Sequence, residues 1–270
     1  MNPTLHHWLK GYHKFLSNSN ERKFFRMSLR YGKKERYKPI KIKFLRFNFE
    51  LPDALSFIWQ FKEIFVEEYY RIETKSESPV IYDCGANVGT SCAYFKYRYP
   101  QSQIVAFEPN AKIADYLVKN IKNNSMENIE VINKAVWTDD NGLELGMDDA
   151  DASSIHLTKN KTKVDSVRLK DYLEKEKDVD MLKMDIEGAE TEVLKDCRES
   201  LSKVKNIFVE FHSYRKEPQR FSQVTEVLEN AGFRYFIMQP ENRVSPLINH
   251  YNKSNPGMDL QLNIFAYRLD

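Results

Sequence analysis

Four ionisable side chains that close two neighbouring predicted strands could carry out acid–base chemistry. Asp185 ends the apolar run 179–184, and Glu187 follows two positions later. Glu210 and His212 end the next apolar run with the same spacing. Residues two apart on an extended strand point to the same side, and α/β sheets hold ligands at the carboxyl ends of their parallel strands. We therefore expect these four side chains to face one cleft.

The four side chains fit two chemical arrangements. In the first, His212 is a general base, because its ordinary pKa lies near neutrality, and Asp185 or Glu210 orients its ring. In the second, Asp185, Glu210 and His212 hold a divalent metal that acidifies a hydroxyl. The alternative without chemistry is a histidine satisfied by backbone groups, with Glu187 placed favourably at a helix N-terminus. The sequence leaves all three open, and it fixes no metal site.

A glycine-containing turn upstream is typical of a cofactor site. The strand 79–82 runs into this turn and then into a helix, and the predicted contacts are Asp83, Gly85, Ala86, Asn87, Gly89, Thr90 and Ser91. Glycines let the backbone turn sharply and let a ligand approach its amides. The dinucleotide fingerprint G-x-G-x-x-G lacks its middle glycine here. Because an acid facing the ligand repels a pyrophosphate but attracts a sulfonium, the predicted cofactor is S-adenosylmethionine.

A second acid stands at the distance expected for a ribose contact. Glu108 follows the apolar strand 104–107 and lies 19 residues after Gly89, close to the offset of about 20 residues at which a strand-end acid binds ribose hydroxyls. Asn110 is predicted to cap the helix 111–123. Further predicted cofactor contacts are Pro109, Asn110, Asn133 and Ala135, the last two after the third strand where the adenine is expected.

These motifs together resemble the FkbM family of S-adenosylmethionine-dependent O-methyltransferases. The resemblance rests on D-x-G-A-N-x-G-T-S, A-F-E-P-N, Met184-Asp185-Ile186-Glu187-Gly188-Ala189-Glu190 and Val209-Glu210-Phe211-His212, and it covers roughly residues 47–270. The D-I-E-G-A-E block is its specific element, because many methyltransferases share the glycine turn. The resemblance implies a class I methyltransferase sheet. It also implies an acceptor hydroxyl on a small molecule or glycan, of sugar or polyketide type, which composition and spacing do not show.

Alternating strands and helices predict an α/β fold with a parallel sheet covered on both faces. The resemblance implies that this sheet is Rossmann-like and mostly parallel, with an antiparallel last strand. We expect a basic, mainly helical accessory region over 1–75, with a strand at 40–50 and a helix from Pro52-Asp53, and a methyltransferase domain over 76–270. The predicted strands are 79–84, 103–108, 129–137, 179–186, 206–212, 233–239 and 262–269, with short ones near 143–147 and 163–168. The predicted helices are 90–99, 111–123, 169–176, 190–203 and 218–231.

Charge is distributed unevenly along the chain of 270 residues. Residues 1–46 hold 13 Lys and Arg against two acids, a net charge of +11, so the remainder carries −9 and the whole chain +2. Apolar residues at helical spacing, such as Leu5, Trp8 and Leu9, make this segment amphipathic. It could pack on its own acidic domain or on a partner subunit in a homo-oligomer, or lie on an anionic membrane surface; nucleic acid is the least favoured partner.

The remaining composition limits where the protein works and which rival functions stay open. Three cysteines without metal-type spacing predict buried free thiols and a reducing cytoplasm. The basic segment 1–46 would allow the cytoplasmic protein to attach peripherally to a membrane. One rival is an NAD-dependent oxidoreductase or epimerase, which uses a similar strand–helix–strand unit. The other is a non-catalytic, methyltransferase-like binding protein. The retained Asp83, Glu108, Asp185 and His212 argue against the second rival, since a pure scaffold needs none of them.

Overall fold

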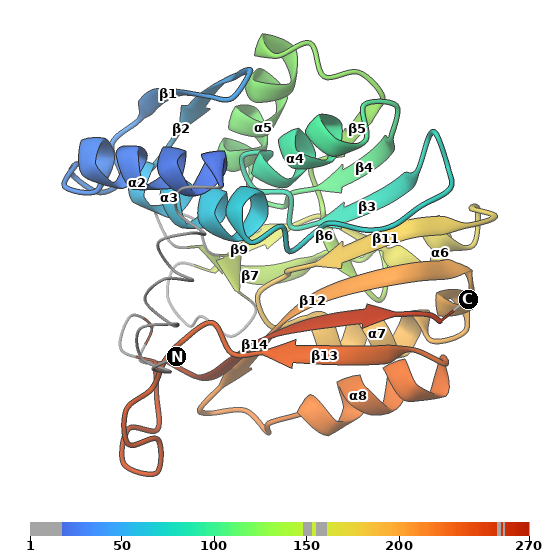
Figure 1. Cartoon of the computed structure of the whole chain (residues 1–270). Coiled ribbons are helices and arrows are strands. Elements are labelled where there is room, and N and C mark those ends of the chain that lie inside the picture. The colour runs from blue at the N-terminus through green and yellow to red at the C-terminus, as the bar shows by residue number, and fades with distance from the viewer. Residues whose placement is uncertain (1–17, 148–152, 155–160, 253–254, 256, 270) are drawn as a thin grey trace, which may run out of the picture.

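The computed structural model describes residues 18–147, 153–154, 161–252, 255 and 257–269. Within these residues one seven-stranded sheet runs in the order β13-β14-β12-β11-β3-β4-β5 (Figure 1). Its strands are β3 Val80–Cys84, β4 Gln103–Phe107, β5 Ile129–Ile132, β11 Val179–Met184, β12 Val204–Tyr214, β13 Arg234–Met238 and β14 Met258–Tyr267. The strand pairs from β12 to β5 are parallel, and β14 is antiparallel to both of its neighbours. The predicted Rossmann-like sheet with an antiparallel last strand is confirmed.

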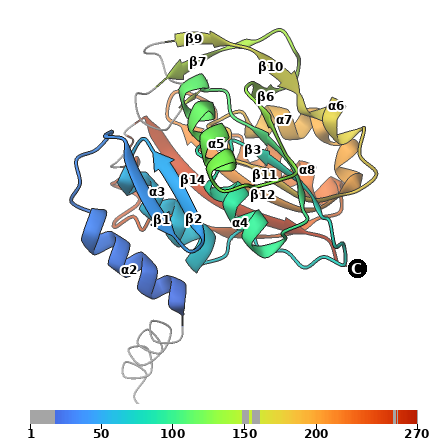
Figure 2. The ribbon, with the colours of Figure 1, turned by 90° about the horizontal axis from the view of Figure 1, so that it is seen from above.

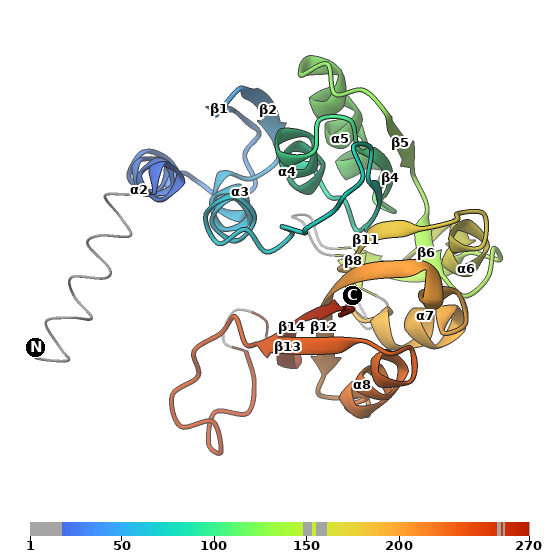
Figure 3. The same cartoon turned by 45° about the vertical axis from the view of Figure 1, so that its right-hand side comes forward.

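Alternation along the buried strands divides the core into two layers. Ile81, Met181 and Phe208 belong to one apolar cluster, together with the helices α4 Thr90–Arg98 and α5 Ala111–Asn123. Their strand neighbours, such as Tyr82 and Leu182, belong to the opposite cluster, under α6 Leu169–Leu173, α7 Glu190–Cys197 and α8 Phe221–Asn230. Because successive strand residues point to opposite faces, both faces of the sheet are apolar and both are covered (Figures 1 and 3).

The N-terminal elements pack onto the α4–α5 face. They are α2 Ser19–Tyr31, a hairpin of β1 Ile40–Phe44 and β2 Phe47–Leu51, α3 Ala54–Phe61, and the π-helix η1 Lys62–Val66. The predicted strand 40–50 is this hairpin, which turns where Leu45 adopts a left-handed φ of 47°. A cluster of phenylalanines, with Phe44 in contact with Phe49, Phe57 and Phe65, joins the hairpin to α3 and η1.

Helix α2 lies outside α3, on the side away from the sheet (Figure 2). Its Met27 is buried, its Phe24 ring lies 6.1 Å from that of Trp59, and Asn20 donates to the Phe65 carbonyl. Residues 19–31 therefore pack on the chain's own domain. The apolar face predicted around Trp8 lies outside the described residues. The boundary predicted at residue 75 stays a prediction, and side chains from both sides of it share one core.

Two further predicted elements differ from the structure. The strand predicted over 129–137 divides, because β6 Ala135–Trp137 leaves the main sheet and pairs with β10 Ser166–Arg168. The helix predicted over 190–203 ends at Cys197 and is followed by the 3-10 turn η2 Ser200–Lys203. Outside the main sheet, β7 Leu143–Met147 pairs with β8 Ser153–Ser154 and β9 Lys161–Val164.

The three cysteines are free and buried, as predicted. Cys92 belongs to the α4–α5 side of the core, and Cys84 and Cys197 to the other. Burial raises the thiol pKa of Cys84 and Cys92 well above the ordinary value and that of Cys197 to about 12. In the part of the chain that the structure describes, no helix combines the length and apolarity needed to cross a bilayer.

Candidate active site

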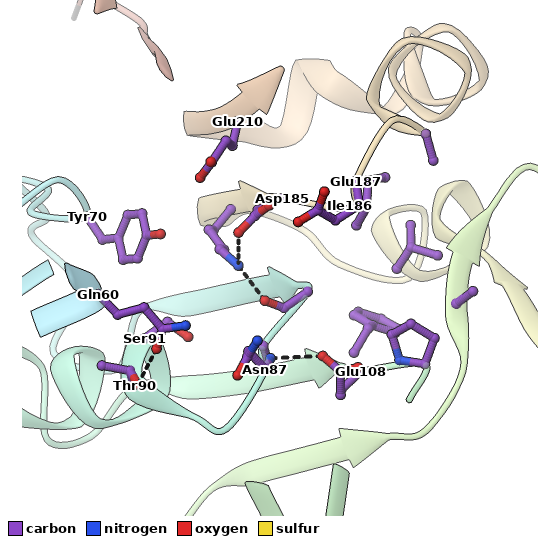
Figure 4. A pocket seen from close by; sticks show the side chains of 18 of the residues that line it. Gln60, Tyr70, Asn87, Thr90, Ser91, Glu108, Asp185, Ile186, Glu187 and Glu210 are labelled. Atoms are coloured by element: carbon purple, nitrogen blue, oxygen red, sulfur yellow. Dashed lines mark hydrogen bonds and ion pairs between the residues drawn. The ribbon is translucent and has the colours of Figure 1, made fainter. Parts of the chain in front are cut away.

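A cavity of about 220 Å³ opens at the carboxyl ends of β3, β4 and β11. Figure 4 shows Glu108 and Asn87 on one side of it and Asp185, Glu187 and Glu210 on the other. Ligands are expected at this edge of an α/β sheet. Of the predicted site residues, those that line the cavity are Gly85, Ala86, Asn87, Thr90, Ser91, Glu108, Pro109, Ala135, Asp185, Glu187 and Glu210.

The glycine turn brings the ends of β3 and β11 together. Gly85 has a φ of +84°, and a Cβ added there would stand 1.9 Å from the Asp185 carbonyl oxygen. Gly89 has a φ of +89°, and its Cβ would stand 2.7 Å from a Leu117 methyl group. The close backbone contact at Gly85 and the left-handed φ at both positions thus favour glycine, in addition to the approach of a ligand expected from the sequence. The turn lets the backbone amide of Asp185 donate to the Cys84 carbonyl.

Glu108 is held in place by the turn it faces. Its Oε2 accepts from the Asn87 amide at 3.0 Å and its Oε1 from the Asn110 amide at 2.9 Å. Burial raises the pKa of Glu108 to about 7, although these two hydrogen bonds lower it. The carboxyl group therefore titrates near neutrality at the cavity wall.

Three other predicted cofactor residues support this wall from behind. Asn110 caps α5, as expected, by accepting from the Lys112 and Ile113 amides. Asn133 donates to the Glu108 and Pro109 carbonyls and so holds the end of β4. Gly89 precedes α4. None of the three is among the residues described as lining the cavity.

Asp83 was expected to face the ligand, and the structure places it elsewhere. Its side chain is fully buried, accepts from Ser91 Oγ and Cys92 Sγ, and lies 3.3 Å from Lys183 Nζ. The same ammonium donates to the Gly85 carbonyl and stands 3.6 Å from Asp185 Oδ2. Because a lone charge is costly to bury, Asp83 and Lys183 neutralise each other beneath the turn, and it is Lys183 that reaches the cavity.

The predicted grouping of strand-end acids and histidine is present. Glu210 and His212 are two apart on β12 and so lie on the same side of it, and Asp185 and Glu187 follow the end of the neighbouring β11. His212 Nε2 lies 3.6 Å from Glu210 Oε1 and 3.8 Å from Glu187 Oε2. Its Nδ1 lies 3.0 Å from Glu190 Oε1, a contact that the sequence analysis did not foresee.

The imidazole of His212 sits behind the carboxylates. It lies outside the set of residues lining the cavity, and its side chain is 2% exposed. Burial lowers the pKa of His212, but the attraction of Glu187 and Glu190 outweighs burial and raises that pKa well above the ordinary value. A doubly protonated ring has no lone pair with which to accept a proton. This geometry favours a carboxylate over His212 as the group that meets a substrate.

Repulsion and burial raise the pKa values of two cavity carboxyls. For Asp185 the causes are burial and the nearby Glu210, and they hold its pKa well above the ordinary value. For Glu187 the main cause is burial, partly offset by His212. Burial also acts on Glu210, but its interaction with His212 prevails and its pKa is lowered. Carboxyl groups with raised pKa values are stronger bases than ordinary ones.

Several cavity residues were missed by sequence reasoning. Gln60, Glu63, Ile64 and Tyr70 come from α3, η1 and the segment after them, within the region predicted to be accessory. Burial, together with Glu210, raises the pKa of Glu63 to about 7. Lys183 was also missed, although a lysine inside an apolar strand is a signal, since lysine is seldom fully buried unless paired.

The cavity is apolar at the end beyond Glu108. The residues there come from β4, β6, β7 and the turns at their ends, and they are Phe107, Pro109, Ala135, Val136, Leu143 and Leu145. The opposite end carries the carboxylates and Lys183. The cavity thus suits a ligand with a flat apolar group at one end and a cationic group at the other.

The sequence of this chain is similar to those of known methyltransferases. The family model described as "Methyltransferase FkbM domain" matches residues 83–235. The chain is 27% identical over 207 residues to "Methyltransferase 1" of Beauveria bassiana (strain ARSEF 2860), covering 67% of this chain and 82% of that protein. It is 29% identical over 212 residues to "Methyltransferase sdnD" of Sordaria araneosa, covering 64% of this chain and 80% of the other.

Among solved structures, the fold is similar to that of a methyltransferase FkbM from Methylobacillus flagellatus KT. The TM-score is 0.45 and the sequence identity 14%, with 91% of this chain and 58% of the other covered.

Proposed function

Because this chain belongs to the FkbM methyltransferase family, whose members take their methyl group from S-adenosylmethionine, we propose that it methylates a hydroxyl oxygen of a sugar or polyketide-type acceptor. The observation that carries the proposal is the set of carboxylates at the ends of β11 and β12, which faces Glu108 across one cavity. When bound, the cofactor supplies a methyl group activated by a positively charged sulfur.

The residues of the cavity fit this cofactor. The Glu108 carboxylate is placed to accept from ribose hydroxyls, and the apolar end around Val136 and Leu145 offers a surface for an adenine ring. Acidic side chains at the other end favour a cationic sulfur and an amino group. Lys183 donates to the Gly85 carbonyl and so fixes the turn.

Transfer to an alcohol requires that the hydroxyl lose its proton while its oxygen is held in line with the methyl group. Asp185 lines the cavity and has a raised pKa, so it is our candidate for the proton acceptor. Glu187 and Glu210 would orient the hydroxyl from the same side. His212 lies within 4 Å of both and stabilises their charge, so we assign it a positioning role.

The product decides between this proposal and its rivals. The purified protein is incubated with an extract of its source cells and S-adenosylmethionine carrying an isotopically labelled methyl group, and labelled products are identified by mass spectrometry and NMR. We expect a methyl ether, and a labelled amine or carbon centre would contradict O-methylation. Equilibrium titration with S-adenosylmethionine and with NAD separates a methyltransferase from an oxidoreductase, and binding without any turnover would favour the non-catalytic protein.

We also propose that the basic N-terminal region contacts an anionic membrane surface near the acceptor. Arg26, Arg30, Lys33 and Lys34 are exposed on and just after α2, and Leu29 among them is 70% exposed. Basic and apolar side chains on one exposed helix surface are typical of interfacial helices.

A further inference from the structure

We propose that Asp185, Glu187 and His212 form a binding site for a hard divalent cation of the Mg²⁺ and Mn²⁺ class, with Glu210 beside it. One possible ligand atom from each of the first three residues lies within 4.8 Å of the others. These residues come from the ends of two adjacent parallel strands, whose register brings Met184 beside Val209. The backbone of the sheet therefore fixes where the group assembles.

The distances between the possible ligand atoms are close to those of an occupied metal site. With metal–ligand bonds of about 2.1 Å, two ligands at right angles are about 3.0 Å apart and two opposite ligands about 4.2 Å apart. The 3.6 and 3.8 Å from His212 Nε2 to Glu210 and Glu187 fall within that range. The span of 4.8 Å exceeds it slightly. The side chains of Asp185 and Glu187 are 28% and 27% exposed, so they have room to move inward.

The orientation of His212 is the second observation that points to an ion. Its Nδ1 lies 3.0 Å from Glu190 Oε1, and Glu190 is 1% exposed. A carboxylate only accepts, so Nδ1 donates and the ring presents Nε2 to the acids. A buried carboxylate that fixes the other nitrogen of a histidine is the usual support of a metal-binding imidazole. Glu190 is itself held by the Gly188 amide at 3.0 Å.

The two carboxylate oxygens that face Nε2 also accept from other side chains, Glu210 Oε1 from Gln261 and Glu187 Oε2 from Tyr214, and neither closes a short ion pair with the ring. A charge-assisted hydrogen bond between a ring nitrogen and a carboxylate has a length of about 2.7–2.9 Å. Both acids that face Nε2 stand well beyond that distance, although the ring is almost completely buried. The gap between them is where a cation would replace the proton on Nε2.

Lys183 does not take the place of this ion. Its Nζ stands 3.6 Å from Asp185 Oδ2, farther than the 3.3 Å to Asp83, and it donates to the Gly85 carbonyl. Lys183 is thus engaged beneath the turn, and Asp185 keeps ligand capacity toward the cavity.

The ligand set selects the class of ion. Two or three carboxylates with one imidazole and no thiolate suit Mg²⁺ or Mn²⁺ better than a soft metal. The role of the ion rests on the proposed function: beside the acceptor it would lower the pKa of the hydroxyl and hold its oxygen. Binding of the ion does not depend on that role.

Direct binding of Mn²⁺ to the full-length, metal-stripped protein tests the site. Loss of the free Mn²⁺ signal in electron paramagnetic resonance gives the affinity, and Mg²⁺ is added as competitor. We expect binding that Mg²⁺ reverses, and an affinity that falls at least ~10-fold in H212A and in E187Q. The matched control is E63Q, which removes a carboxylate from the same cavity but from outside the cluster. We expect less than a threefold change there.

Wild-type protein that leaves the Mn²⁺ signal unchanged would overturn the site, and so would an equal loss of affinity in E63Q and E187Q, which would mean general attraction only. Thermal melting checks that each variant is folded, and E187Q carries the test if H212A is not. Methyl ether formation that continues in excess chelator, without Mn²⁺ binding, would refute the site and leave the proposed function standing. Mn²⁺ binding without any methyl ether would do the reverse.

Discussion

At the scale of single residues, Glu108 has the most direct consequence for cofactor binding. Replacing it by glutamine removes a charged acceptor, and a hydrogen bond to a charged group contributes about 1.5–3 kcal/mol. We therefore expect E108Q to bind S-adenosylmethionine roughly ten- to a hundredfold more weakly. Isothermal titration calorimetry measures the change, and unchanged affinity would remove Glu108 from the cofactor site.

The raised pKa of Glu108 also predicts how affinity depends on pH. With a pKa of about 7, most of the carboxyl is ionised at pH 8 and little at pH 6. The affinity for S-adenosylmethionine should therefore fall about tenfold as the pH is lowered from 8 to 6. Glu63 titrates in the same range, and E63Q is the control. If the pH dependence of affinity disappeared in E63Q and persisted in E108Q, its cause would be Glu63 and not Glu108.

The raised pKa of Glu108 also predicts how the stability of the folded protein changes with pH. Folded Glu108 holds its proton more tightly than the unfolded chain, whose ordinary value is 4.5. Its contribution to the free energy of unfolding is therefore fully present below about pH 4.5 and falls as pH rises toward 7, by at most ~3 kcal/mol. Cofactor-free protein should lose stability over this interval by more than the cofactor-bound protein does, which denaturation at pH 5 and pH 8 would show.

Asp185 is the residue on which turnover should depend most. D185N keeps the shape of the side chain but cannot take up the hydroxyl proton, and loss of a general base costs about 10²- to 10⁴-fold. We expect turnover to fall by at least ~10²-fold with the cofactor affinity unchanged within a few-fold. Full turnover in D185N would show that Asp185 is not the base.

At the scale of elements, the basic surface of α2 predicts that the protein binds to anionic membranes. We expect the wild-type chain to sediment with vesicles of anionic phospholipid at low salt and to be released as salt rises, because exposed charges are screened beyond about 10 Å at 0.1 M. R26E/R30E/K33E/K34E should abolish this binding while cofactor affinity is retained. Binding that persists in the variant, or that salt does not affect, would count against an electrostatic contact.

The sequence predicted the elements of the sheet because their patterns are local. Apolar runs of four to six residues that end in an acid or a glycine defined β3, β4 and β11, and Asn110 marked the start of α5. Periodicity could not show that Asn133 would hold the end of β4 and that Ala135 would leave the main sheet, since both depend on partners far along the chain.

The site was predictable to the same extent. Parity along β12 placed Glu210 and His212 on one side, and their side chains lie 3.6 Å apart. Two contacts could not be read from spacing: the pairing of Asp83 with Lys183, 100 residues later, and the approach of Glu63 from η1. An acid before a glycine turn has the same sequence pattern whether it faces a ligand or a buried lysine.

At the scale of the whole molecule, the aromatic cluster predicts where the chain can be shortened. Phe57 and Phe61 are buried against Phe44 of the hairpin, and η1 lines the cavity. Deleting residues 1–75 would expose this face, so we expect an aggregated or unfolded product. Circular dichroism and sedimentation velocity decide, and a soluble, cofactor-binding fragment 76–270 would show that the first 75 residues are an independent appendage.

A single side-chain substitution within the aromatic cluster measures how much the cluster contributes to stability. F57A should lower the free energy of unfolding by about 3–5 kcal/mol, the usual cost of a buried phenylalanine. L29A, at a side chain that is 70% exposed, is the control and should change it by less than ~0.5 kcal/mol. Equal effects of the two would mean that the cluster adds little to the core.

The burial of all three thiols has a practical consequence for kinetics. A buried cysteine reacts with an alkylating reagent only when the surrounding structure opens. The labelling rate of each thiol therefore reports how often the structure around it opens. Cys92 reports on one side of the sheet, and Cys84 and Cys197 report on the other. Peptide mass spectrometry after timed alkylation would therefore show whether the two sides of the sheet open cooperatively or independently, without any engineered probe.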